Sequence, residues 1–213
     1  MLTLPRSAVY LITDVQNRLL SIDVSYTLFD QGIRHIATLA GYLSYGLMAL
    51  AIFFGILTTT GWGRRFVSRS RMSSAHMLLA VTALAFGVLH GVSYIFQTGQ
   101  NFRLINAIVP FVSGGSLGVG LGIIGLDLGI AVALSILIQR RLGYRRWHIV
   151  HYIAYGAFIL SLAHTFISST EVQTLRLLGI GVFGAAGACL LMFILRILPA
   201  TATVGVRIAP EEG

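Results

Sequence analysis

The sequence predicts an all-α membrane protein, a five-helix transmembrane bundle with an N-terminal amphipathic interfacial helix. Two counts over its 213 residues predict this class: 56% are hydrophobic and only 10% are charged, whereas soluble domains have about 25% charged residues. The mean hydropathy of +0.84 agrees with it. A soluble protein of 23.0 kDa could not bury so much apolar surface. The single cysteine excludes a disulfide-rich scaffold.

Residues 1–35 are expected to form an amphipathic segment that does not cross the membrane. Asp14, Arg18 and Asp23 would otherwise lie in hydrocarbon, where charged groups are costly. Apolar residues nevertheless recur at helical spacing, with an Asp14–Arg18 pair on the other side. We expect either a helix that lies in the interface or one that docks on a partner subunit. The recurring apolar residues are Ala8, Ile12, Val15, Leu19, Ile22 and Tyr26.

Five later stretches are apolar enough to cross a membrane, for which a helix needs about 20 residues. They make up a predicted transmembrane domain at 36–198, and a tail at 199–213 follows it. The stretch 104–115 contains Pro110 and is expected to be an apolar loop or half-helix. The five predicted spans are Ile36–Leu57, Ser74–Phe96, Gly118–Ile138, His148–Ser168 and Leu177–Leu198.

Arginine supplies all 15 basic residues, against 7 acidic ones, and the formal charge is +8. The arginines gather in loops between apolar spans, so they indicate topology and no nucleic-acid partner is expected. The two arginine-rich loops should be cytoplasmic, which places the N-terminus outside and the tail inside a bacterial-type inner or cell membrane. One loop holds Arg64, Arg65, Arg69 and Arg71, and the other holds Arg140, Arg141, Arg145 and Arg146.

The third predicted span is rich in glycine and contains one acidic residue. Gly120, Gly122 and Gly125 match a dinucleotide-binding fingerprint, but that motif works only between a strand and a helix. Inside an apolar span these glycines favour close helix packing instead. Asp127, near the membrane centre, is either a functional residue or a protonated acid bonded to a neighbouring helix.

Four of the six histidines lie in the second and fourth predicted spans. His76 and His90 are fourteen residues apart, which is about 21 Å along a helix and on one face of it. His151 and His164 are thirteen apart. The second and fourth spans cross the membrane in the same direction, so we expect His76 to meet His151 near the cytoplasm. His90 and His164 are expected to meet near the outer side.

Two imidazole pairs, one above the other, are what two haem groups would need for electron transfer across a membrane. Imidazole is a good iron ligand, and two on one haem leave no free position for oxygen. Structural zinc would need four ligands in one site. Thirteen residues turn His164 about 140° from His151 on an ideal helix. The fourth span should therefore bend, tilt or carry a π-bulge, which Gly156 would permit. His148 is a less favoured substitute for His151.

These residues resemble the ferric reductase-like transmembrane domain, a family that includes eukaryotic ferric reductases, NADPH oxidases and bacterial haem subunits of the MsrQ type. The resemblance covers roughly residues 36–198. It is carried by the segments Phe86–Tyr94 and Arg141–Tyr155 and by His164. It implies an inner haem b held by His76 and His151, and an outer haem b held by His90 and His164.

We therefore expect a di-haem b-type cytochrome subunit that passes electrons between a cytoplasmic or quinol donor and an extracytoplasmic acceptor. The family usually has a sixth span, and many members continue into a flavin and nicotinamide domain. Few residues follow the last span here, so a redox partner subunit, a quinone or a bound FMN is expected to supply electrons. Two alternatives stay open. One is a membrane scaffold that binds one haem or none, and the other is a quinol-oxidising cytochrome b anchor of a respiratory reductase.

Overall fold

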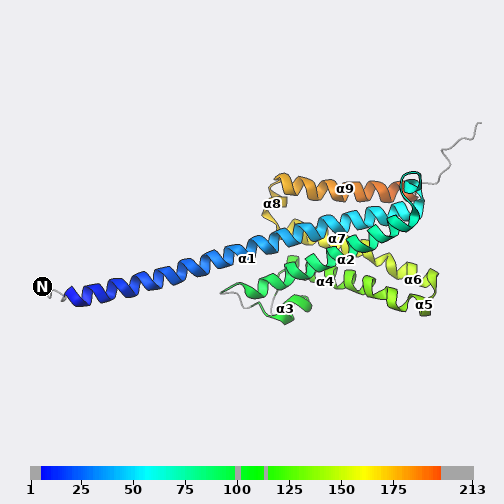
Figure 1. Ribbon diagram of the computed structural model, residues 1–213. Coiled ribbons are helices and arrows are strands. Elements are labelled where there is room, and N and C mark those ends of the chain that lie inside the picture. The colour runs from blue at the N-terminus through cyan, green and yellow to red at the C-terminus, as the bar shows by residue number, and fades with distance from the viewer. Residues whose placement is uncertain (1–5, 99–101, 113–114, 198–213) are drawn as a thin grey trace, which may run out of the picture.

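The computed structural model describes residues 6–98, 102–112 and 115–197, and the side chains of these residues except 6–26, 64 and 65. Over these ranges the chain is helical and contains no strand (Figure 1). The predicted tail 199–213 lies outside the described residues. Five helical stretches are long and apolar enough to cross a membrane, which confirms the predicted number of spans. They are Thr27–Thr60, Arg69–Phe96, Leu117–Leu142, Tyr144–Ser168 and Leu177–Ile197.

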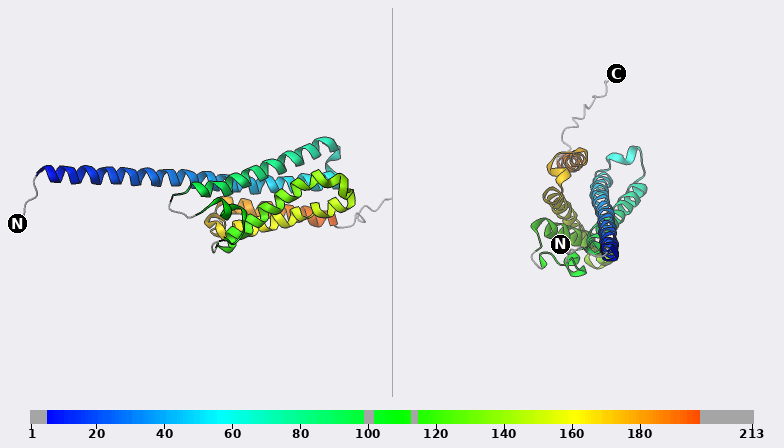
Figure 2. Two further views of the ribbon diagram at one scale, coloured as in Figure 1. Left: turned by 90° about the horizontal axis from the view of Figure 1, so that it is seen from below. Right: turned by 90° about the vertical axis from the view of Figure 1, so that its left-hand side faces the viewer.

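The first helix, α1 (Arg6–Thr60), is one continuous element of 55 residues. At 1.5 Å per residue it is about 80 Å long, more than twice the thickness of a membrane's hydrocarbon core. Its N-terminal part projects well beyond the other helices (Figures 1 and 2). The predicted N-terminal segment is thus helical, but no break separates it from the first span. Its position at a membrane interface stays a prediction.

Turns with clear local causes join the first two membrane helices. Gly61 follows α1 with a φ of 76°, a left-handed conformation that glycine adopts without strain. A short 3₁₀ turn, η1 (Trp62–Arg65), leads to α2 (Arg69–Ser93). The side chain of Ser68 caps α2 by accepting a hydrogen bond from the backbone N–H of Arg71. The chain therefore reverses direction, and α2 returns antiparallel to α1.

The remaining helices complete the bundle around α1. α2 packs along α1 and also contacts α4, while α4 packs along α7, and α1 contacts α7 and α9. Short 3₁₀ turns extend α2 and α4; these are η2 (Tyr94–Phe96) and η4 (Ser135–Ile138). The other helices are α3 (Leu104–Ile108), α4 (Leu117–Leu134), α5 (Gln139–Leu142), α6 (Tyr144–His151), α7 (Ile153–Ser168), α8 (Thr170–Gln173) and α9 (Leu177–Ile197).

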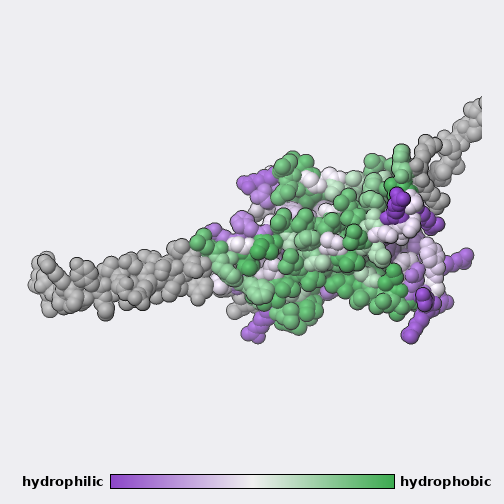
Figure 3. All heavy atoms as spheres, viewed as in Figure 1, coloured by the Kyte–Doolittle hydropathy of each residue, from purple (hydrophilic) through white to green (hydrophobic). Residues whose placement is uncertain are grey.

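The core between α1, α7 and α9 is small, and most large apolar side chains face outward. Tyr45 and Phe158 stack at its centre, with ring centroids 5.1 Å apart. Cys189 is also buried there. Figure 3 shows a broad hydrophobic region on the near face of the bundle, with hydrophilic residues toward its two ends. An apolar outer surface of this kind is suited to lipid.

Candidate functional site

The four predicted histidines line one cavity of about 860 Å³ inside the bundle. Sites for small molecules and cofactors typically have volumes of about 300–1,000 Å³. His76 and His90 come from α2, His151 from the end of α6, and His164 from α7. Residues of α1 and α4 also line the walls. Side chains from two distant stretches of sequence thus share one interior space.

The structure places the histidines in the two expected pairs. The ring centroids of His76 and His151 are 5.9 Å apart, with 70° between the ring planes. Those of His90 and His164 are also 5.9 Å apart, with 74° between the planes. Two metal–imidazole bonds of about 2 Å each, plus the short distance from each ring centre to its nitrogen, give a similar separation. Each pair therefore has room for one metal atom between its rings.

Backbone carbonyl groups of α1 hold both rings of α2. The Nδ1 atom of His76 lies 2.7 Å from the carbonyl oxygen of Ala51. The Nδ1 atom of His90 lies 2.7 Å from the carbonyl oxygen of Ala37. The neighbouring helix α1 therefore helps to orient both histidines of α2.

The same contact recurs on α4, where the Nδ1 of His164 lies 2.7 Å from the carbonyl oxygen of Gly118. A carbonyl oxygen can only accept a hydrogen bond, so Nδ1 donates in all three contacts. In a neutral imidazole the other nitrogen, Nε2, then keeps a free lone pair. This is the tautomer of a histidine that binds a metal through Nε2 and is oriented by a hydrogen bond from Nδ1.

Three glycines of α1 and α4 lie directly against these rings. A Cβ atom built at each of them would lie between 2.7 and 3.2 Å from an atom of the facing imidazole. Sequence reasoning missed Gly41 and Gly55, and it assigned Gly122 only to helix packing. Each of the three follows an alanine or glycine by four residues. The contacts pair Gly41 with His90, Gly55 with His76 and Gly122 with His164.

His151 is held in a different way. Its Nδ1 atom is buried, and no hydrogen-bond partner for it exists among the residues that the structure describes. The indole of Trp147 stacks on its ring instead, with centroids 5.0 Å apart and 28° between the planes. Trp147 is fixed in turn because its Nε1 donates to the hydroxyl of Ser135 at 3.1 Å. Aromatic packing therefore orients this fourth ring.

The helix irregularity expected between His151 and His164 lies at Tyr152. The α6 helix ends at His151 and α7 begins at Ile153. The backbone nitrogen of Tyr152 lies 3.2 Å from the carbonyl oxygen of His148 and 3.1 Å from that of Ile149. The carbonyl oxygen of Tyr152 accepts a hydrogen bond from the N–H of Tyr155. The expectation that Gly156 permits the bend is wrong, because Gly156 lies within regular α7.

Tyrosines and an arginine line the cavity near the arginine-rich loops. His148 joins neither pair; its ring stacks on Tyr144, with centroids 5.4 Å apart. Arg196 donates to the hydroxyl of Tyr155 at 2.9 Å and to that of Tyr152 at 3.2 Å. The guanidinium also lies 5.6 Å from the centre of the Tyr152 ring. This end of the cavity therefore combines flat aromatic surfaces with a positive charge.

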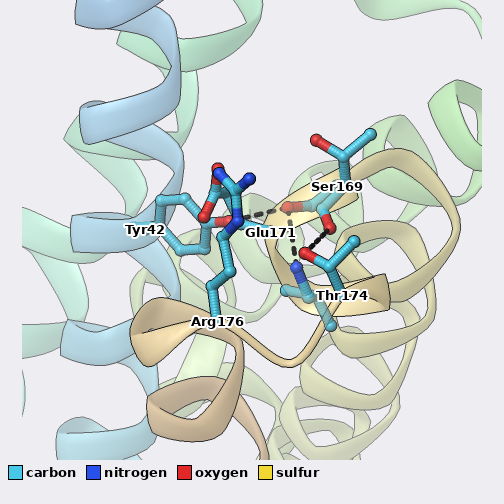
Figure 4. A network of polar contacts seen from close by, with 7 residues as sticks. Tyr42, Ser169, Glu171, Thr174 and Arg176 are labelled. Atoms are coloured by element: carbon cyan, nitrogen blue, oxygen red, sulfur yellow. Dashed lines mark hydrogen bonds and ion pairs between the residues drawn. The ribbon is translucent and has the colours of Figure 1, made fainter.

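A polar network ties the other end of the bundle together (Figure 4). The hydroxyl of Tyr42 in α1 lies 2.6 Å from the hydroxyl of Ser169, the residue that caps α8. Close by, Arg176 forms an ion pair with Glu171 at 2.9 Å. These contacts hold the turn between α7 and α9 against α1. Tyr42 directly follows Gly41, the glycine that faces His90.

The glycine-rich face of α4 serves close helix packing, as predicted. A Cβ atom at Gly118 or Gly125 would meet the side chain of Ser168 or Ser161 in α7. In the part of the chain that the structure describes, no strand precedes these glycines. A dinucleotide fingerprint requires a strand, a turn and a helix in that order, so these glycines do not form one.

Two other polar residues in or near the spans lie outside the cavity. Asp127 is exposed on the outer face of α4, and His35 is exposed on α1. Within the described part of the chain, Asp127 has neither a hydrogen bond nor an ion pair, so the bond to a neighbouring helix that was one expectation for it is not observed. A carboxyl group on this apolar surface is unusual.

Comparison with known proteins places the chain in a family. The family model described as ferric reductase like transmembrane component matches residues 40–162, which is more than half of the chain. A Schizosaccharomyces pombe (strain 972 / ATCC 24843) protein named ferric/cupric reductase transmembrane component 2 is 29% identical over 75 residues. That match covers 35% of this chain and only 13% of the relative. From the extent of the family match, the chain belongs to the ferric reductase like transmembrane component family.

Proposed function

We propose that this chain carries electrons across a membrane through two haem b groups. One would bind between His76 and His151, and the other between His90 and His164. Membership of the family supports electron transfer across a membrane. The haem proposal is carried by one observation, the presence of two imidazole pairs of equal separation in one cavity.

The donor set fits two haem groups better than other metal sites. No group of three or more histidine, cysteine or acidic side chains in the described ranges could hold a metal ion, as a structural zinc site would require. Each pair offers two imidazoles, which suit an iron whose other four ligands belong to a planar ring. The glycines against the rings keep the neighbouring backbone close without filling the cavity.

In this proposal the protein binds, orients and insulates its cofactors. A bound haem supplies the one-electron chemistry of its iron. The carbonyls of Ala37, Ala51 and Gly118 fix the tautomer and direction of three ligands. His76 and His90 are fourteen residues apart, so the two sites are separated by about 21 Å along α2. Two sites at this spacing cover most of a hydrocarbon core about 30 Å thick.

The donor is proposed to act at the end of the bundle with the arginine-rich loops, which the positive-inside rule places in the cytoplasm. A redox partner subunit, a quinol or an FMN could use the aromatic surfaces of Tyr144 and Tyr152 there. The acceptor would act at the His90–His164 end. With these loops inside, the N-terminus lies outside and the C-terminus lies in the cytoplasm.

The test is to measure the haem content of the purified protein. We expect about two haems per chain and a reduced-minus-oxidised absorption band at about 560 nm, which is typical of bis-histidine haem b. Replacement of one histidine of a pair by alanine should remove one haem and leave the other. The four variants are His76→Ala, His90→Ala, His151→Ala and His164→Ala.

His148→Ala is the matched control, because His148 lines the same cavity but joins neither pair. It should retain two haems. Loss of a haem in His148→Ala with none lost in His151→Ala would assign the ligand to His148. A wild-type protein without haem would contradict the proposal and favour a membrane scaffold.

A further inference from the structure

Three of the four histidines make the same two contacts with a neighbouring helix. Each donates its Nδ1 hydrogen to a backbone carbonyl, and each faces the glycine four residues further along that helix. We call a carbonyl followed four residues later by such a glycine a carbonyl–glycine notch. The notches are Ala37–Gly41 facing His90, Ala51–Gly55 facing His76 and Gly118–Gly122 facing His164.

Helix geometry explains why a glycine is needed at this position. The Cα–Cβ bond of each helical residue tilts toward the N-terminus. The Cβ of a residue therefore stands beside the carbonyl four positions earlier, to which its own N–H is bonded. Without a Cβ, the free lone pair of that carbonyl is accessible to a ring from outside. A Cβ at Gly41 would lie 2.9 Å from Nδ1 of His90, which is too close for the ring to stay in place.

The notches of α1 match the histidines of α2 in spacing. Ala37 and Ala51 are fourteen residues apart, and so are His76 and His90. Because the two helices are antiparallel, the first notch faces the later histidine and the second notch faces the earlier one. Two contacts repeated at equal spacing indicate that the notches position the rings.

The fourth histidine, His151, faces no notch among the described residues, and α4 offers none fourteen residues beyond Gly118–Gly122. Fourteen residues beyond the Gly118–Gly122 notch lie Val132 and Ile136. The carbonyl of Val132 already accepts a hydrogen bond from the Ser135 hydroxyl at 2.6 Å. Residue 136 is isoleucine, so a Cβ stands where a notch has a glycine, and it lies in the 3₁₀ turn η4. The Nδ1 of His151 is thus left without a partner among the described residues.

The two histidine pairs therefore differ in how strongly they would donate electrons to iron. A hydrogen bond from Nδ1 to an acceptor makes the imidazole a more basic ligand. A more basic ligand favours oxidised iron and lowers the reduction potential of a haem. His90 and His164 both have notches, whereas in the other pair only His76 has one.

We infer that the carbonyl–glycine notches set the reduction potentials of the two sites apart, with the lower potential at the His90–His164 site. This inference rests on the proposed haem binding. The first electron added to the fully oxidised protein would then reduce the iron at the His76–His151 site from Fe(III) to Fe(II). Gly41, Gly55 and Gly122 are positioning residues in this account, since they act through the histidines that they face.

The experiment is a potentiometric titration of the purified haem protein and of single glycine variants. Gly41→Ala and Gly122→Ala should each disturb one Nδ1 hydrogen bond and raise the lower of the two potentials. Gly55→Ala should raise the higher potential instead. We expect a change on the order of tenfold in the ratio of reduced to oxidised haem at a fixed potential, or about 59 mV for a one-electron couple.

Gly46→Ala is the matched control, because it also replaces a glycine of α1 and a Cβ there would meet no atom within 4 Å. It should leave both potentials unchanged. If Gly41→Ala keeps only one haem, the remaining haem should be the one of higher potential. Two haems of equal potential in the wild type, or equal shifts in Gly41→Ala and Gly46→Ala, would overturn the inference. A wild-type protein without haem would instead contradict the proposed function.

Discussion

Phe158 of α7 and Tyr45 of α1 are both buried, and their rings stack with centroids 5.1 Å apart. Tyr45 also donates its hydroxyl hydrogen to the carbonyl of Val182 in α9 at 3.3 Å. One aromatic pair thus joins three helices. In a membrane protein the contribution of such a pair comes mainly from close packing, because lipid is as apolar as the protein interior.

Phe158→Ala is therefore expected to lower the free energy of unfolding by about 1–3 kcal/mol. Phenylalanine to alanine changes in the cores of soluble proteins cost about 3–5 kcal/mol, part of which is transfer from water. Denaturant or thermal unfolding in detergent measures the change. Phe166→Ala is the control, because Phe166 is 51% exposed on the same helix. Equal losses in the two variants would contradict the packing account.

Single residues also show what sequence reasoning can and cannot find. The four histidines were identifiable because imidazoles are rare within apolar spans and need a partner there. The notches were not, because their acceptors are backbone atoms and their other members are alanine and glycine. Small residues are common in every membrane helix, so Gly41 could not be told from Gly46 without the neighbouring helix.

The element that departs from regular geometry is the fourth span, where α6 ends at His151 and α7 begins at Ile153. The thirteen-residue spacing of His151 and His164 predicted that this span could not be an ideal helix. It did not locate the irregularity at Tyr152. Gly156 was a reasonable candidate by residue type, but tyrosine adopts the local geometry because its N–H still finds the carbonyls of His148 and Ile149.

Gly156→Ala is consequently expected to retain both haems and to leave stability unchanged or raise it by up to about 1 kcal/mol. Gly156 is helical, and a Cβ there would meet no atom within 4 Å. Alanine is favoured over glycine by about that amount in a helix interior. Haem content and thermal unfolding are the measurements. Loss of one haem would show that the bend needs the glycine after all.

The α1 helix shows a second limit of sequence reasoning. The charged residues before position 35 indicated a segment distinct from the first span. No proline lies between Arg6 and Thr60, and polarity alone does not interrupt a helix. The sequence therefore showed that α1 changes from polar to apolar along its length. It did not show that the helix continues without a break.

For the molecule as a whole, the number of spans followed from composition, since hydrocarbon thickness fixes the length of a spanning helix. The arrangement of the helices did not follow, except where the histidine pairs required α2 to face α6 and α7 across the cavity. The outer surface adds one unexpected feature. Asp127 is exposed on α4 in the middle of an apolar span.

Asp127 is expected to react with a hydrophobic carbodiimide in the membrane, because an exposed carboxyl in an apolar span is accessible to a lipid-soluble reagent. Mass spectrometry of the labelled protein would locate the modification, and Asp127→Asn should abolish it. Asp30 is the comparison, since it accepts a hydrogen bond from the Thr98 N–H at 3.0 Å near the end of the bundle. Protection of Asp127 from the reagent would show that another chain covers this face of α4.

The equal spacing on α1 and α2 limits how the length of this protein can change. Fourteen residues are close to four helical turns, so both contacts on each helix point the same way. One residue inserted between Gly41 and Ala51 would turn the second contact by about 100° and move it by about 1.5 Å. Descendants of this chain can therefore tolerate an insertion there only with a compensating one between His76 and His90, whereas insertions before Ala37 are free of that constraint.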